Sequence, residues 1–223
     1  MIDGISVHES RRRAGELLAE RYPVDADLVT GVPDSGLDAA LGFSERSGIP
    51  YGIGLIKNKY IGRTFISPGQ RERLDQVRIK LSPVRSVIEG KRVVLIDDSI
   101  VRGTQLRETT EFLYDSGAKE VHIRPACPPL VYGCKFLNFS RSSSEMDLIT
   151  RRVIARLEGT EDVSEEVLEQ YTDPESEKYD QMVEEIRKEL NFTSLRFNRL
   201  DDMLEAVGIP KEKLCTYCWN GKD

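Results

Sequence analysis

The 223-residue sequence predicts an α/β fold in which helices flank a central parallel sheet. Short apolar runs alternate with helical patterns through the first half of the chain, which is typical of right-handed β-α-β crossovers. One run, Val93–Ile96, leads directly into two carboxylates and a glycine-containing turn. Because α/β sheets carry their chemistry at the carboxyl ends of the strands, the same observation predicts where a functional site lies.

The N-terminal region predicts one helix followed by one buried strand. Ser6 and Glu9 have the spacing of a capping box, and residues 11–22 follow a helical pattern that Pro23 stops. The apolar run 28–32 then predicts a strand, which ends in a loop rich in glycine.

The following elements continue the alternation. The predicted ranges are a helix from residue 37 through residue 43 and beyond, strands at 51–56, 92–96 and 121–124, and a helix at 104–116 terminated by Gly117. These elements complete a sheet whose strand ends share one edge.

A long basic segment between residues 56 and 93 interrupts this pattern. It begins with Lys57–Phe65 and carries further basic residues, among them Arg71, Arg73, Arg78, Lys80 and Arg85. An ordinary connection is much shorter, which favours a functional lid over a plain loop. A solvated, charged insertion is the alternative interpretation.

The composition changes near residue 142, and we place a domain boundary there. Residues 1–141 form the predicted ligand-binding domain, and residues 142–223 form a mainly helical extension. The acid-rich stretch 160–179 predicts a pair of surface helices or a mobile excursion, and 182–190 and 200–207 are candidate amphipathic helices.

The charge balance argues against two classes of partner. The chain has 32 basic and 38 acidic residues, a formal charge of −6, so nothing draws it generally to nucleic acid or to a membrane surface. It contains no apolar run of membrane-spanning length, and its first residues lack the features of a signal peptide. We therefore expect a cytoplasmic location.

The turn after the predicted central strand has the chemistry of a sugar-phosphate site. Residues 99–104 offer consecutive backbone N–H groups, two hydroxyls and the start of a helix, all of which favour a phosphate. Asp97 and Asp98 would repel that phosphate, so sugar hydroxyls, a divalent cation or both are their expected partners. The sequence thus predicts a ribose 5-phosphate site, and the Walker pattern of nucleoside triphosphatases is absent.

This turn resembles the phosphoribosylpyrophosphate (PRPP) signature of type I phosphoribosyltransferases. Three other segments narrow the resemblance to the glutamine PRPP amidotransferases: 31–35 (GVPDS), 54–65 (GLIKNKYIGRTF) and 215–221 (CTYCWNG). The resemblance implies the type I phosphoribosyltransferase fold with a flexible lid. It also implies the transfer of ammonia to C1 of PRPP, which yields 5-phosphoribosylamine and pyrophosphate in the first step of purine synthesis.

The resemblance also assigns roles to individual residues. It implies that Ser35, Asp97 and Asp98 surround a Mg2+ ion on PRPP. The remaining implied positions are a pyrophosphate loop from Val32 to Gly36 that includes Asp34, a 5-phosphate cradle of Ser99, Val101, Arg102, Gly103 and Thr104, and catalytic side chains Lys57, Tyr60, Arg63, Asp97 and Asp98. A homo-oligomer and inhibition by purine nucleotides are further expectations from the family.

The cysteines resemble the cluster-bearing branch of the same family. Its [4Fe-4S] ligands fall on Cys134, Cys215 and Cys218, but a fourth thiolate is not evident in the chain. Cys127 is the local substitute and matches no cluster position, so zinc remains a rival metal.

The glutaminase domain of the family has no counterpart in the first residues of this chain. We therefore expect ammonia to come from a separate glutaminase domain or subunit. Two other interpretations stay open: a PRPP-binding regulatory module without turnover, and a salvage phosphoribosyltransferase that acts on a purine base. A salvage enzyme would need a base-binding hood, which the cysteine-bearing tail does not resemble.

Overall fold

The computed structural model describes residues 1–59, 81–136 and 145–222. Its elements in chain order are α1 (Val7–Arg21), β1 (Leu28–Gly31), α2 (Leu37–Ser47), β2 (Leu55–Lys57), β3 (Leu81–Pro83), α4 (Arg85–Ile88), β4 (Arg92–Asp97), α5 (Thr104–Asp115), β5 (Glu120–Pro125), η1 (Glu145–Asp147), α6 (Ile149–Glu158), α7 (Glu165–Thr172), α8 (Glu177–Glu189), β6 (Ser194–Leu195), α9 (Leu200–Val207), η2 (Lys211–Lys213) and α10 (Tyr217–Asn220).

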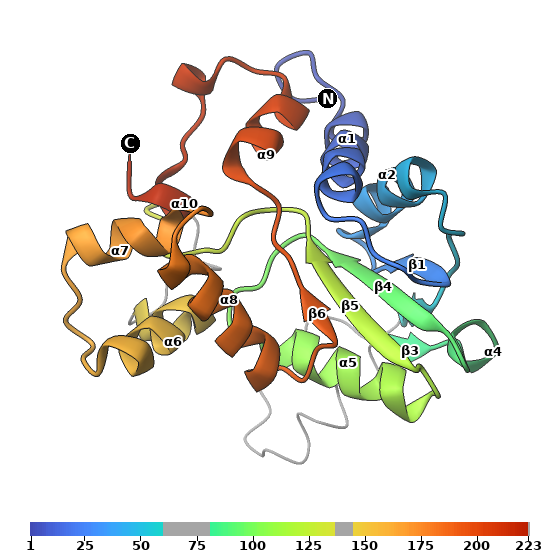
Figure 1. Ribbon diagram of the computed structural model, residues 1–223. Coiled ribbons are helices and arrows are strands. Elements are labelled where there is room, and N and C mark those ends of the chain that lie inside the picture. The colour runs from blue at the N-terminus through green and yellow to red at the C-terminus, as the bar shows by residue number, and fades with distance from the viewer. Residues whose placement is uncertain (60–80, 137–144, 223) are drawn as a thin grey trace.

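The central sheet is parallel throughout and has the strand order β1-β4-β5-β6 (Figure 1). On one face, Leu18 of α1 and Phe43 of α2 pack against Val94 and Ile96. The opposite face belongs to a larger core that includes α5 and the helices α6, α7 and α8 of the C-terminal extension. The predicted α/β architecture with helices on both faces is confirmed.

The N-terminal helix begins where the capping box predicted. The Ser6 hydroxyl accepts a hydrogen bond from the Glu9 N–H at 3.3 Å. Further along α1, a Cβ on Gly15 would lie 1.9 Å from the Ala39 carbonyl oxygen of α2. The absent side chain therefore lets the two helices pack with their backbones in contact.

The prediction of one continuous strand of the central sheet over residues 51–56 is wrong, although Leu55 and Ile56 do belong to a strand, β2. Only Tyr51 bridges the central sheet, opposite Val29, and β2 pairs antiparallel with β3 in a separate two-stranded sheet. Gly52 and Gly54 lie between these two pairings, and the Gly54 N–H donates to the Thr30 side-chain hydroxyl and to the Gly52 carbonyl rather than to a backbone carbonyl of β1. Glycine weakens a strand, and here it allows the chain to leave the central sheet.

The C-terminal extension supplies a strand that the sequence did not predict. β6 pairs with β5 through Ser194 opposite His122 and Leu195 opposite Ile123. The acid-rich stretch forms the predicted helices, α7 and the start of α8, although Tyr171 is buried. The domain boundary at residue 142 stays a prediction, and one hydrophobic core includes residues from both sides of it.

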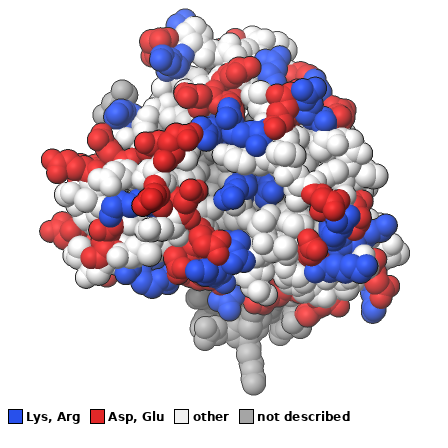
Figure 2. Space-filling model, viewed as in Figure 1, with Lys and Arg blue, Asp and Glu red and all other residues white. Residues whose placement is uncertain are grey.

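Charges of both signs are distributed over the molecular surface. On the face shown in Figure 2, acidic and basic side chains are interspersed rather than gathered into separate patches. Among the described helices, none has both the length and the hydropathy that a membrane span needs.

A buried polar chain connects β5 to β6. Arg124 Nη1 donates to Ser194 Oγ at 3.0 Å, and Ser194 Oγ lies 2.9 Å from Nδ1 of His122. Nε2 of His122 lies 2.9 Å from a Glu120 carboxylate oxygen. All these bonds are made when His122 is neutral with its proton on Nε2, because Ser194 can then donate to Nδ1.

We predict that acidification weakens the fold through His122. Burial, and next the charge of Arg124, lower the pKa of His122, although the hydrogen bond to Glu120 acts in the opposite direction. The unfolded chain therefore takes up the proton first, so stability is full above pH ~6.5 and falls as the pH drops below that value. Between pH 7.5 and 5.5, the free energy of unfolding of His122→Asn should decline less steeply than that of the wild type. Equal slopes in denaturant titrations would contradict this expectation.

Candidate active site

Three loops meet at the carboxyl edge of the central sheet. The register of β4 places Ile96 opposite Gly31 of β1 and Asp97 opposite Pro125 of β5. The three strands therefore end at the same level, and the loops that follow them lie side by side.

The loop after β1, residues 32–36, folds tightly against the end of β4. The Val32 N–H donates to the Ile96 carbonyl at 2.8 Å, and the Gly36 N–H donates back to the Val32 carbonyl at 2.9 Å. A Cβ on Gly36 would lie 2.4 Å from the Ile96 oxygen. Glycine at position 36 is thus required for this approach, which places the neighbouring Ser35 in the wall of the cavity described below.

The two adjacent acids at the end of β4 lie in different environments. Asp97 is 9% exposed, and its carboxylate accepts a hydrogen bond from the Asp98 N–H at 2.8 Å, whereas Asp98 is exposed. Burial, and next the neighbouring charge of Asp98, raise the pKa of Asp97 to about 8. This carboxyl group is therefore poised to gain or lose a proton near neutral pH.

Residues 99–104, which we call the phosphate cradle, form the rest of the site. Gly103 has φ +81° and precedes the first turn of α5, whose N–H groups face the site. The cradle, the acid pair and the loop after β1 line a cavity of about 430 Å³. The residues lining it are Val32, Pro33, Ser35, Asp97, Asp98, Ser99, Ile100, Val101, Arg102, Gly103, Thr104, Gln105 and Leu106.

The structure brings together most of the site residues expected from the sequence. Asp34 and Gly36 belong to the loop without lining the cavity, and Lys57 of β2 forms an ion pair with Asp34 at 2.5 Å. The Lys57 ammonium lowers the pKa of Asp34 through this bond. Tyr60 and Arg63, the other predicted lid residues, lie outside the described residues.

Comparison with known protein families assigns residues 4–127 to the family described as the phosphoribosyl transferase domain. This match covers more than half of the chain. The chain belongs to the phosphoribosyltransferase family.

Similarity to known sequences continues beyond these residues over nearly the whole chain. The amidophosphoribosyltransferases of Methanocaldococcus jannaschii and Bacillus subtilis are 45% and 41% identical over 221 and 225 residues. Each alignment covers 99% of this chain, but only 40% and 41% of the relatives. The chain thus spans about two fifths of the length of the curated relatives it matches.

A solved relative confirms the predicted type I phosphoribosyltransferase fold. Glutamine PRPP amidotransferase from B. subtilis, complexed with ADP and GMP, is 41% identical and superimposes with a TM-score of 0.77. The alignment covers all of this chain and 43% of that protein. The resemblance to glutamine PRPP amidotransferases inferred from the sequence motifs is confirmed.

The predicted cluster cysteines of this phosphoribosyltransferase lie near one another. The Cys218 carbonyl accepts hydrogen bonds from the N–H groups of Val131 and Tyr132, both at 3.0 Å. These bonds hold the C-terminal tail against the segment that leads to Cys134. Burial, and next Cys134, raise the pKa of Cys218 to about 11, and Cys215 contributes in the same direction.

The thiols do not form a closed metal centre. Within residues 1–59, 81–136 and 145–222, no three His, Cys, Asp or Glu side chains are arranged so that they could hold a metal ion. The fourth thiol, Cys127, donates to the Pro128 carbonyl at 3.2 Å, and burial followed by the charge of Asp98 raises its pKa. The donor atoms suit a soft metal, but a complete ligand set is not present.

Sequence reasoning missed part of the cavity wall. Gln105 and Leu106 line the cavity although they lie beyond the predicted ranges 32–36 and 99–104. Both belong to the first turn of α5, and neither side chain has a charge that would have marked it. The sequence predicts the two loops of the site but not the contribution of the following helix to its wall.

We predict that Asp97→Asn stabilises the ligand-free chain at alkaline pH. The pKa of Asp97 is raised from 3.8 to about 8, so its contribution to stability is complete below pH ~4 and is lost as the pH rises through 8. A neutral amide avoids that loss. Since one pKa unit corresponds to about 1.4 kcal/mol, the variant should gain at least about 1 kcal/mol at pH 9.

Calorimetry at pH 6 and pH 9 tests this expectation. Asp162→Asn, at an exposed position between α6 and α7, is the control and should leave the midpoint unchanged at both values. An Asp97→Asn midpoint at or below that of the wild type at pH 9 would show that the buried carboxylate does not destabilise the fold.

Proposed function

We propose that this chain is the phosphoribosyltransferase half of an amidophosphoribosyltransferase. In the proposed reaction, ammonia attacks C1 of PRPP, the bond from C1 to the pyrophosphate oxygen breaks, and 5-phosphoribosylamine forms as the added nitrogen releases its extra proton. The observation that carries the proposal is the single cavity of about 430 Å³ that combines the phosphate cradle with Asp97 and Asp98.

Different loops of the cavity would bind different groups of the PRPP substrate. The cradle of residues 99–104 would hold the 5-phosphate through backbone N–H groups and the start of α5. The loop after β1, with Ser35 at the cavity wall, would hold the pyrophosphate. Asp97 and Asp98 lie between these two loops, where the ribose hydroxyls of a substrate held at both ends would fall.

The acid pair would also stabilise the reacting ribose. Positive charge develops on the ring as the C1 bond loosens, and two fixed carboxylates favour that charge in a site with little water. Asp97, Asp98 and Ser35 supply the oxygen atoms that would hold Mg2+ on PRPP, where the ion would neutralise charge on the leaving pyrophosphate.

Lys57 links the proposed lid to the pyrophosphate loop. Its ion pair with Asp34 joins β2 to the loop after β1, next to the point where the proposed lid begins. We propose that Lys57, Tyr60 and Arg63 act together on the leaving pyrophosphate when the lid covers the site, and that closure excludes water.

We predict that the purified chain, prepared without oxygen, forms phosphoribosylamine from PRPP, Mg2+ and ammonium but not from glutamine. Asp97→Asn should lower this rate by about 100-fold, the scale of losing one electrostatic stabiliser of the transition state. The product can be trapped and quantified directly. PRPP binding without turnover on either nitrogen source would instead favour a regulatory module.

We further propose that Cys134, Cys215 and Cys218 provide three ligands of a [4Fe-4S] cluster, with zinc as the rival metal. Their support is the sulfur chemistry and the contact of Cys134 with Cys218. A fourth ligand would come from elsewhere, and no step of the reaction above depends on the cluster.

Cys215→Ser should lose its bound iron. Serine is a poor ligand for an iron–sulfur cluster, so iron and acid-labile sulfide should both fall, while Cys127→Ser should keep them. Full iron retention by Cys215→Ser would contradict the assignment, and stoichiometric zinc with no sulfide would identify the rival metal.

The proposed partners follow from the resemblance to the glutamine PRPP amidotransferases. A separate glutaminase domain or subunit would supply the ammonia. Because the B. subtilis relative was solved with ADP and GMP, we also propose purine nucleotides as inhibitors, acting on a homo-oligomer.

A further inference from the structure

The C-terminal extension donates hydrogen bonds to backbone carbonyls of the phosphate cradle. The Ile149 N–H, at the start of α6, donates to the Val101 carbonyl at 2.9 Å, and Arg152 Nη2 donates to the Arg102 carbonyl at 2.9 Å. The C=O and the following N–H of a trans peptide point in opposite directions. These two bonds therefore turn the N–H groups of Arg102 and Gly103 away from α6.

Among the described residues, the hydrogen-bond partners of Arg152 are all backbone carbonyls. Besides Arg102, Nη1 donates to the carbonyls of Asp147 at 3.0 Å and Met146 at 3.4 Å. The Asp147 carboxylate is bound to Arg102 at 3.1 Å, and in the described part of the chain no carboxylate lies within ion-pair distance of Arg152. One guanidinium thus clamps the cradle to η1 while keeping an unpaired positive charge beside it.

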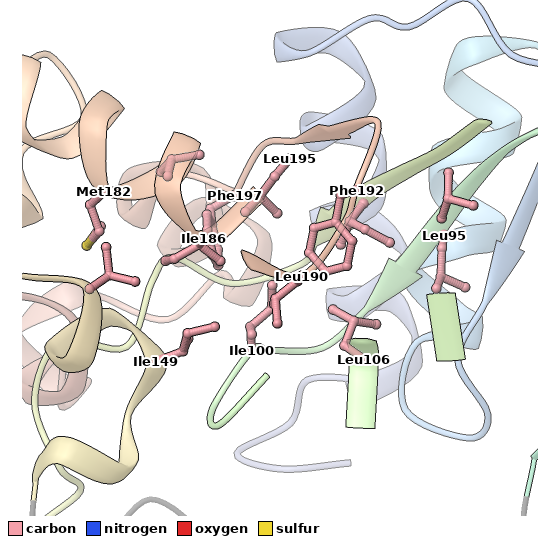
Figure 3. Close-up of a cluster of buried hydrophobic side chains, with 14 of the residues drawn as sticks. Leu95, Ile100, Leu106, Ile149, Met182, Ile186, Leu190, Phe192, Leu195 and Phe197 are labelled. Carbon is pink, nitrogen blue, oxygen red and sulfur yellow. The ribbon is translucent and has the colours of Figure 1, made fainter. Parts of the chain in front are cut away.

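Apolar side chains of the extension also pack against the cradle. Gly103 has φ +81°, and a Cβ there would lie 2.7 Å from Cδ1 of Ile149 and 3.1 Å from the Leu190 methyl groups. Ile100 and Leu106, both less than 5% exposed, belong to the same cluster of side chains (Figure 3). Ile149 and Leu190 therefore give the cradle an apolar support, which Ile100 and Leu106 continue to the cavity wall.

We propose that Arg152 is a positioning residue for the 5-phosphate of the substrate. By fixing the Arg102 carbonyl, it orients the following N–H group of the cradle, and its unpaired charge favours an anion in front of that group. This role rests on the proposed function. The residue acts through the cradle, so its effect is restricted to the 5-phosphate and does not extend to the pyrophosphate loop on the far side of the cavity.

Equilibrium binding of two fragments of the substrate tests this role. With Mg2+ present, Arg152→Ala should bind ribose 5-phosphate about tenfold more weakly than the wild type, while its affinity for inorganic pyrophosphate stays within twofold. Arg152→Lys should recover part of the loss, because an ammonium keeps the charge but cannot reach all three carbonyls. Arg156→Ala is the matched control, since Arg156 lies on the same helix and pairs with Glu189 at 3.0 Å.

Three results would distinguish failure of the proposed role of Arg152 from failure of the proposed function. Ribose 5-phosphate binding by Arg152→Ala at wild-type strength would overturn the role of Arg152. Equal weakening of both ligands, with a lowered unfolding midpoint, would also overturn it, because Arg152 would then act only on stability. If the wild-type chain binds neither PRPP nor ribose 5-phosphate, the proposed function itself fails.

Discussion

The parallel register of β4 with its two neighbours is the constraint on which the site depends. Asp97 is opposite Pro125, and Ile96 is opposite Gly31, so the loops after three strands start at one level. A one-residue shift of β4 would turn its buried side chains to the opposite face and separate the acids from the cradle. The sheet core thus determines which backbone groups can reach a bound phosphate.

Hydrogen bonds from distant parts of the chain also stabilise this edge of the sheet. Asn198 is fully buried, and its amide group donates to the carbonyls of Ala14 at 3.3 Å and Ala126 at 3.2 Å. Ala126 in turn donates its N–H to the Asp97 carbonyl at 2.8 Å. Helix α1, the loop after β5 and the segment after β6 are therefore joined directly behind the acid pair.

Local sequence was sufficient to predict the parts of the site that are contiguous. The strand into Asp97, Asp98 and the phosphate cradle occupies one short stretch, in which apolar burial, charge and helix start occur in order. The pairing of β2 with β3 and the addition of β6 were not predictable in this way. These strands are two or three residues long, and their partners lie far away in the sequence.

The hydrogen bonds of Arg152 to the cradle and to η1 could not be predicted from local sequence either. Its three acceptors are backbone carbonyls, which every residue possesses, so no motif marks the contact. The cysteine tail was partly predictable, because the Cys-x-x-Cys spacing is local, whereas its docking on Val131 and Tyr132 is not. Sequence motifs identify the groups that touch a ligand, but the groups that hold those residues in place follow from tertiary packing.

The extension and the sheet therefore share their stability as well as their core. Leu190 of the extension packs with Ile100 and Leu106 beneath the cradle, and β6 completes the sheet beside β5. A change that loosens α6 or α8 must release apolar surface and hydrogen bonds on the far side of the phosphate cradle. Order in the cradle is thus coupled to folding of the last third of the chain, although none of the described residues beyond Leu106 lines the cavity itself.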